Sequence, residues 1–449
     1  MKQGICAFVF LLCAGAVSAH ALDPFSVYTE KTPKNCLTLS QSTDEALSLP
    51  DLIEIGICNN PALNRDYTAV QISQASLGSV RSEYLPAVTL IGSVSQSYSK
   101  KQGEDSDRGN PYTGDVALSW LIYDFGGRSA RTDQISAYLK RSEQLYNAAL
   151  HDTILAITTA YFETLSAQEV LKSSETSLES YRKSYQESNR RFELGLAALS
   201  DKLLAQTSYE QSKLSVEQAK NTLTRTMGDL AVLLNVSPDT RFDLKRPPRD
   251  RDISKLETDM PVSEMMAEAI QLRPEIQSQL SALEAARQGV EIAKSASLPN
   301  LSAKISAGWD DNWKYHSPYA YGSSVGLSLS VPLFTGFKDT YNISKAKFEL
   351  RDAELATDEL TQIVKNEVWA AYQNYVTAVA SYKITGTVLN SAEENERVAF
   401  TSYQVGQGSI LNLLTATSQL AEARREKIVA FYKVLTTKST LYRAIGRIR

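Results

Sequence analysis

Four segments of the chain alternate apolar and polar residues with a period of two. These predicted strands are residues 87–98, 113–123, 300–309 and 320–333. In the third, Leu301, Ala303 and Ile305 alternate with Ser302 and Lys304. Such alternation predicts strands with one apolar and one polar face. Each is close to the length of a tilted membrane-crossing strand, roughly 9–11 residues. Lipid on one face and water on the other would suit them, but a sheet covering a soluble core has the same pattern.

Two long segments without helix breakers predict very long helices. Residues 128–194 contain neither glycine nor proline, and residues 338–405 contain only Gly386. At about 1.5 Å per residue, each helix would be roughly 100 Å long. Heptad spacing from Leu171 to Phe192 predicts coiled-coil contacts with neighbouring helices. Small and polar residues in this seam favour wide or wet packing, and a solvated rod-like bundle is the alternative.

The same order of elements occurs twice. Pro61 and Pro86 of the first copy correspond to Pro274 and Pro299 of the second. Each copy is predicted to contain a helix, two strands, a long helix and a further helix. The first copy is predicted at residues 50–234, with its last helix at 197–234. A linker is predicted at 235–260, and the second copy at 261–449, with its last helix at 409–446. The chain is therefore predicted to be internally duplicated, with units too long for a solenoid repeat.

The N-terminus has the pattern of a secretory signal peptide. Lys2 precedes an apolar stretch, and small residues follow at Ala19 and Ala21. We expect residues 1–19 to be removed, with cleavage after residue 21 as the alternative. Residues 20–49 are predicted to be an irregular N-terminal segment. The chain is therefore expected to be exported.

The composition of the chain argues against a disordered protein and against a nucleic-acid-binding protein. The chain has 449 residues, 22% of them charged, and a formal net charge of −4. It is neither disordered in composition nor basic enough to favour nucleic acid. Of four cysteines, Cys36 and Cys58 lie beyond the leader. An oxidising compartment favours a disulfide between them, and two buried free thiols are the alternative.

Catalytic motifs are not found. The three histidines, His20, His151 and His316, have no metal-ligand spacing, and neither a nucleophile elbow nor a phosphate loop occurs. The triplet at 124–126 resembles a kinase magnesium motif but lacks its companion loops, so it is interpreted as a strand-to-helix turn. We expect no enzyme activity, no cofactor and no metal.

Four strands are too few to close a membrane barrel. The smallest single-chain barrels have about eight strands, and open sheet edges are not tolerated in lipid. If the strands cross a membrane, copies of the chain must associate through them. Three copies would supply twelve strands.

Several motifs in this duplicated frame resemble the TolC-like outer-membrane factors. The resemblance covers essentially the whole mature chain and rests on the two Leu-Pro strand entries, the strand-to-helix segments 120–127 and 331–336, and the helix-hairpin tips 191–201 and 402–412. It implies an α+β membrane protein, a homotrimer with a 12-stranded transmembrane β-barrel continued by a long periplasmic α-helical barrel. It also implies a Gram-negative outer-membrane location, with a periplasmic adaptor (membrane fusion protein) and an inner-membrane ABC or RND transporter as partners.

The resemblance assigns roles to the hairpin tips. The residues implied in adaptor docking are Leu194, Gly195, Leu196, Val405, Gly406 and Gln407. The residues at positions of the periplasmic gate are Ser200, Asp201, Tyr403, Gly408, Asn412 and Thr415. In the family, a tyrosine and an arginine of the second tip hold an aspartate of the first. Here Tyr403 and Asp201 match, but the arginine position is Gly408, and Asn412 and Thr415 replace aspartates of some relatives. We therefore expect a neutral constriction and a looser closed state, unless Gln407 or Lys202 substitutes for the arginine.

The expected function is a passive exit duct for cargo delivered by an inner-membrane transporter. The segment Cys58-Asn59-Asn60-Pro61, with Cys36 upstream, resembles the type I protein secretion branch. Multidrug or small-molecule efflux is the alternative within this class. A periplasmic coiled-coil structural protein and an exported enzyme are the alternatives of other classes.

Overall fold

The computed structural model describes residues 46–99, 107–109, 111–246, 260–312 and 320–447. The chain forms two compact units. Unit 1 includes Thr68–Glu143 and Ser278–Thr357, and unit 2 includes Gln144–Gln277 and Asp358–Arg449 together with the segment ending at Tyr67. Each unit takes elements from both sequence copies, so the units and the copies do not coincide. The predicted leader, residues 20–45 of the predicted N-terminal segment and half of the predicted linker lie outside the described residues.

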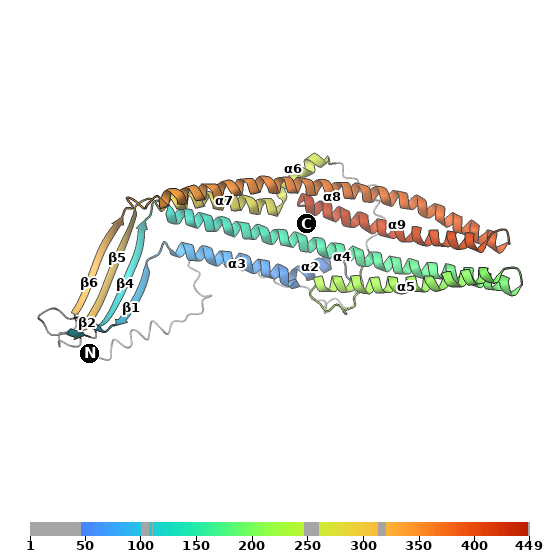
Figure 1. Cartoon of the computed structure of the whole chain (residues 1–449), viewed down its shortest axis with the longest axis horizontal. Coiled ribbons are helices and arrows are strands. Elements are labelled where there is room, and N and C mark those ends of the chain that lie inside the picture. Colours follow the sequence, from blue (N-terminus) through green and yellow to red (C-terminus); the bar gives the residue numbers. More distant parts are fainter. Residues whose placement is uncertain (1–45, 100–106, 110, 247–259, 313–319, 448–449) are drawn as a thin grey trace. The chain divides into compact units, whose positions relative to one another are not determined.

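Unit 1 contains an antiparallel sheet with strand order β1-β4-β5-β6 (Figure 1). The strands are β1 Ala87–Val94, β4 Pro111–Tyr123, β5 Asn300–Asn312 and β6 Ala320–Ser330. The short strands β2 Ser97–Ser99 and β3 Asp107–Gly109 pair separately. Since β4 belongs to the first copy and β5 to the second, the sheet joins the two copies.

The strand ends differ from the sequence predictions in four places, and the first is that the strand predicted at 113–123 begins at Pro111. The strand predicted at 87–98 ends at Val94, and the chain then enters the separate β2–β3 ribbon. The strand predicted at 320–333 ends at Ser330, because Pro332 has no amide proton for a ladder hydrogen bond. The strand predicted at 300–309 continues to Asn312, which lies opposite Pro111 in the β4–β5 ladder.

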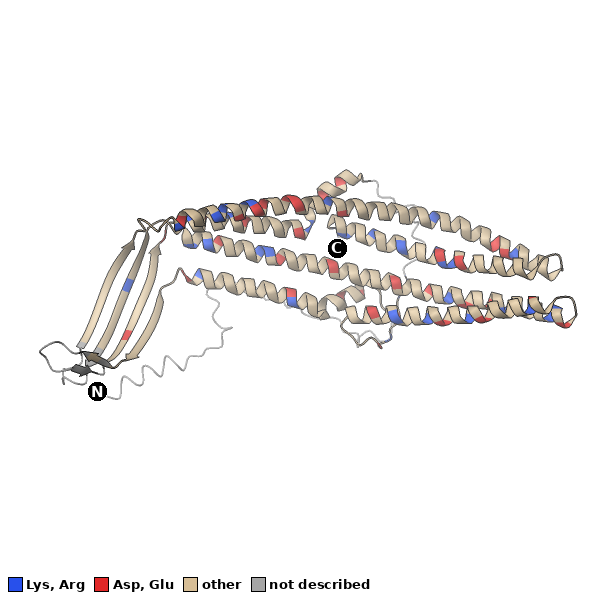
Figure 2. Ribbon diagram, viewed as in Figure 1, with Lys and Arg blue, Asp and Glu red and all other residues tan. Residues whose placement is uncertain are grey.

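The register confirms the two faces predicted from the alternation. Val88 lies opposite Leu118, Leu118 opposite Ile305, and Ile305 opposite Val325, so these apolar residues form one row across the sheet. On the other face, Ala117, Ser306 and Ser324 are opposite one another, and Asp115 and Lys304 carry charges. Figure 2 shows how few charged residues the strands contain.

Both faces of this sheet are exposed in the single chain. Every residue of β1 is exposed. Apolar side chains at opposite edges remain open, with Val88 66% and Val325 80% exposed. A sheet that covered a soluble core would bury its apolar face. The alternative, in which one face of these strands covers a soluble core, is therefore wrong.

The helices are α2 Leu49–Asn59, α3 Pro61–Ser82, α4 Gly127–Glu193, α5 Leu199–Leu233, α6 Val262–Leu272, α7 Pro274–Ser295, α8 Lys338–Gln404 and α9 Ile410–Ile445. The long helices α4 and α8 are both 67 residues long, as the lack of helix breakers predicts. The helix predicted before the strands of the second copy is divided into α6 and α7. Arg273 has an extended backbone there, because a residue before proline disfavours the helical region.

Unit 2 has its apolar core where shorter helices pack on the long ones. One cluster joins Leu52 and Ile55 of α2 to Ile157 of α4 and Leu230 of α5. A second cluster joins Met265 of α6 to Val368 of α8 and Leu441 of α9. Further along α4, the buried residues include Ser177, Ser184 and Ser188. A serine-lined groove between α4, α5 and α9 fits the wet packing expected from the sequence.

Cys58, in the last turn of α2, is disulfide-bonded. The predicted partner, Cys36, lies outside the described residues. The pairing Cys36–Cys58 therefore stays a prediction.

Candidate functional site at the hairpin tips

The two helical hairpins of unit 2 end in turns of the same geometry. At the first tip, the amide of Leu196 donates to the carbonyl of Arg191 at 2.8 Å, and Gly195 has φ +70°. At the second tip, the amide of Gln407 donates to the carbonyl of Ser402 at 2.9 Å, and Gly406 has φ +80°. This is the Schellman arrangement, in which a glycine adopts the left-handed conformation that ends a helix.

The residues with an implied docking role form exposed apolar points at both turns. Leu194 and Leu196 flank the first glycine, and Val405 precedes the second; each is about two-thirds exposed, with Leu194 at 64%. Gln407 is also exposed. Apolar side chains held out into water by short, hydrogen-bonded turns are suited to contact a partner. Their docking role stays a prediction.

The predicted gate residues Tyr403 and Asp201 are not hydrogen-bonded to each other within the chain. Tyr403 is only 3% exposed and packs against Ala205, Ile410 and Leu413. Among the described residues, its buried hydroxyl has no hydrogen-bond partner. The Asp201 carboxylate instead accepts a hydrogen bond from Ser200 Oγ at 3.4 Å, in the first turn of α5.

The shape of the second turn explains the glycine at the family's arginine position. A Cβ atom on Gly408 would lie 3.1 Å from the backbone nitrogen of Tyr403 and 3.2 Å from the carbonyl carbon of Ser402. The amide of Gly408 donates to the carbonyl of Ser402 at 3.0 Å, which holds the turn tight. A side chain at 408 would therefore be crowded, and this backbone would have to shift by a few tenths of an ångström.

The remaining predicted gate residues, Asn412 and Thr415, are uncharged, and the charge of Lys202 lies on the other hairpin. Asn412 and Thr415 are exposed on the first turns of α9, and the amide of Asn412 donates to the N-cap hydroxyl of Ser409 at 3.2 Å. Lys202, one of the two possible substitutes for the arginine, has its ammonium 5.2 Å from the ring centre of Phe192 on its own hairpin. The neutral constriction expected from the sequence stays a prediction.

A different arginine joins the two tips. Arg191, in the last turn of α4, donates from Nη1 to the backbone carbonyl of Tyr403 and, at 3.4 Å, to that of Gln404. Its guanidinium carbon also lies 5.0 Å from the centre of the Tyr403 ring. Sequence reasoning gave Arg191 no role, because its partners are 212 and 213 residues away along the chain.

Within the described ranges, no group of three or more histidine, cysteine or acidic residues is arranged to hold a metal ion.

None of the described helices contains a stretch that is both long and apolar enough to cross a membrane.

The chain belongs to the outer membrane efflux protein family. The family model matches residues 52–236 and again residues 265–447, which reproduces the internal duplication. The protein is accordingly an outer-membrane channel protein that extends into the periplasm, as the sequence resemblance implied.

Several relatives are similar over most of their length. Protein CyaE of Bordetella pertussis is 28% identical over 405 residues, which cover 90% of this chain and 84% of the relative. The toluene efflux pump outer membrane protein TtgC of Pseudomonas putida is 25% identical, covering 89% and 83%. The alkaline protease secretion protein AprF of Pseudomonas aeruginosa is 24% identical, covering 75% and 70%.

The fold matches a solved outer-membrane channel. The structure of OprN superposes with a TM-score of 0.79 at 20% identity, covering 89% of each chain. At this identity the likeness concerns the fold, and it confirms the predicted fold class of four antiparallel strands and long helices in each chain.

Proposed function

We propose that three copies of this chain form a passive outer-membrane exit duct that works with a periplasmic adaptor and an inner-membrane transporter. The observation that carries the proposal is the open four-stranded sheet, with β1 and β6 at its edges and both faces exposed. In lipid, unpaired edge groups cost several kcal/mol each. Pairing β1 of one chain with β6 of the next satisfies them, and three chains close a ring of twelve strands.

The apolar and the polar face of the sheet suit the outer and the inner side of such a barrel. The row from Val88 to Val325 would face lipid, and the face with Asp115 and Lys304 would line an aqueous lumen. Most lumen residues are small, such as Ala117, Ser306 and Gly326. Small side chains leave the lumen wide, which suits large cargo.

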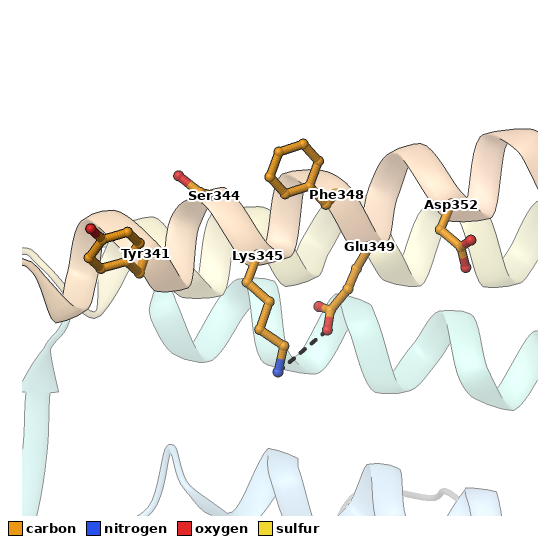
Figure 3. A pocket seen from close by; sticks show the side chains of 6 residues that line it. All are labelled: Tyr341, Ser344, Lys345, Phe348, Glu349 and Asp352. Carbon is orange, nitrogen blue, oxygen red and sulfur yellow. Dashed lines mark ion pairs between the residues drawn. The ribbon is translucent and has the colours of Figure 1, made fainter.

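Helix α8 supplies a second surface for association. A shallow pocket on its N-terminal part is lined by Tyr341, Ser344, Lys345, Phe348, Glu349 and Asp352, all from this one helix (Figure 3). Tyr341 and Phe348 are about three-quarters exposed, and Lys345 pairs with Glu349 at 3.5 Å. Large aromatic side chains left open on a helix favour contact with another chain. We assign this face to the neighbouring subunit.

The proposed cargo is protein, exported by type I secretion. Two observations support it: the small lumen residues, and the likeness to a relative whose name is alkaline protease secretion protein. Small-molecule efflux is the second candidate, favoured by the family description and by the toluene efflux pump relative. The adaptor is proposed to dock on the apolar points around Gly195 and Gly406.

Deleting the gene separates the two cargoes. The account predicts loss of one or more exported proteins from the culture medium, with little change in sensitivity to dyes and antibiotics. Complementation with the intact gene should restore export. Unchanged export with strongly raised dye sensitivity would favour efflux instead, and no change in either would remove the transport proposal.

A further inference from the structure

The contact between Arg191 and Tyr403 joins the ends of two long helices from different hairpins. Arg191 is in the last turn of α4, and Tyr403 and Gln404 are the last residues of α8. The last carbonyls of a helix have no partner inside the helix, and a cation is stabilised near them. Helix α8 has no basic residue in its own last turn. Arg191 supplies that cation from the other hairpin.

The second turn is shaped around this guanidinium. A Cβ atom on Gly406 would lie 3.3 Å from Arg191 Nη2, which is tighter than an ordinary contact. The ring of Tyr403 covers the guanidinium on another side, at 5.0 Å. Carbonyls, ring and bare glycine backbone therefore all contact one side chain, and the contact depends on the two hairpins being side by side.

The polar groups around this contact are buried but not all satisfied. Among the described residues, the buried atoms Arg191 Nε, Ser188 Oγ and Tyr403 Oη have no hydrogen-bond partner. Buried groups without partners are costly, and they regain hydrogen bonds when water reaches them. Separation of the hairpins therefore loses the Arg191 bonds but relieves these groups, so the contact can break and re-form.

We propose that Arg191 is the latch that holds the two hairpins of each subunit together in the closed tip. It takes the place of the arginine that this chain lacks at Gly408. This inference rests on the proposed duct, and it assigns closure to a contact within one subunit. The Tyr403 hydroxyl has no part in it, whereas the ring and the backbone carbonyl of Tyr403 do.

The test is the conductance of the purified channel in planar lipid bilayers. Arg191→Gln removes the cation and should raise the current through the resting channel on the order of tenfold, as expected for loss of a charge-assisted bond. Arg191→Lys keeps the charge but loses the forked geometry, and its current should be intermediate. The matched control is Arg190→Gln, which removes the same charge from the adjacent, exposed residue and should behave like the unmodified channel.

A further variant tests for a gate between the hydroxyl of Tyr403 and the carboxylate of Asp201. Tyr403→Phe removes only the unpaired hydroxyl, whose burial disfavours the closed tip, and should leave the resting current unchanged or lower it. A large increase in this variant, with Arg191→Gln unchanged, would overturn the proposal. Should Arg191→Gln fail to form trimers on native gels, the Arg191→Lys channel decides: a current equal to the original contradicts the latch. A wild-type protein that forms no channel would instead count against the duct.

Discussion

The ammonium of Lys427 lies 3.0 Å from the position that a Cβ atom on Gly386 would occupy. Gly386 is the only glycine in the long helix α8. Lys427, on α9, donates to the carbonyl of Tyr382 at 2.8 Å, and its Nζ is 3.2 Å from the centre of the Tyr382 ring. Burial lowers the pKa of this lysine. The glycine therefore gives α8 the space to accept a cation from the neighbouring helix.

This contact predicts coupling between positions 386 and 427. A glycine inside a helix is destabilising by about 1 kcal/mol relative to alanine, so Gly386→Ala would be stabilising if nothing else changed. With Lys427 in place the added methyl group displaces the ammonium, and the gain should largely disappear. In a Lys427→Ala background the gain should return. The measurement is thermal unfolding followed by circular dichroism for the four proteins of the cycle, and simple additivity would contradict this account.

The buried Arg273 predicts a dependence of stability on pH. Arg273 is 3% exposed, pairs with Glu275 and Glu367, and Glu275 also pairs with Arg443. Burial raises the pKa of Glu275, but the hydrogen bonds from Arg273 and from its own backbone amide, together with the charges of Arg273 and Arg443, outweigh burial and leave the pKa below its ordinary value. A lowered folded pKa means that the stability is present above the ordinary glutamate pKa and is lost as pH falls through the folded value.

The unfolding temperature should therefore decrease as pH is lowered through the acid range. Glu275→Gln should be less stable than the original near neutral pH and should show a smaller decrease on acidification. The comparison of the two pH profiles isolates this carboxylate from the other acidic groups. Parallel profiles would show that Glu275 does not contribute.

Replacing Arg128, at the junction of β4 and α4 in unit 1, should cause a large loss of folding stability. It is buried and donates to the carbonyls of Glu83, at 3.2 Å, and Ile122, at 2.9 Å. Arg128→Ala leaves these carbonyls without a partner, and the cost should be about 2–4 kcal/mol. Arg131→Ala is the control, because Arg131 pairs with Glu83 in an exposed site, where an ion pair contributes about 1 kcal/mol or less. Equal losses in folding stability would contradict the assignment.

The tight turn predicts that restoring the family's arginine will not restore the family's gate. In Gly408→Arg the new Cβ crowds the backbone of Ser402 and Tyr403, so the turn has to shift away from its present conformation. The resting current in planar bilayers should rise or stay the same. A clear decrease in current would show that the turn adapts and that an arginine at 408 can close the tip.

The structural features that could be predicted from the sequence are those determined by residues close together along the chain. Period-two alternation predicted the two faces of the strands, because side chains alternate along a strand. Gly195 and Gly406 directly follow the two long segments that lack helix breakers, and a left-handed turn at the end of a helix favours glycine. The long helices followed from the lack of helix breakers. In each case the physical cause lies within a few residues of the feature.

The contacts that were missed join distant segments. Nothing near Arg191 in the sequence indicates Tyr403, and nothing near Gly386 indicates Lys427. The pairing of β4 with β5, which unites the two copies, likewise depends on tertiary structure. The end of β1 at Val94 follows from the β2–β3 ribbon, whose strands are too short to give a sequence pattern. Interactions within local turns are thus easier to predict than contacts between segments that are distant in the sequence.

The central claim is that β1 of one chain pairs with β6 of the next. Cysteines introduced on the lumen face test it directly: Thr89→Cys or Ser93→Cys on β1, combined with Ser324→Cys or Ser328→Cys on β6. After oxidation in the outer membrane, the account predicts that at least one combination gives covalent species up to three chains on a non-reducing gel, and that single-cysteine variants give none. Only monomers in every combination, from a chain that purifies as a monomer without detergent, would contradict it.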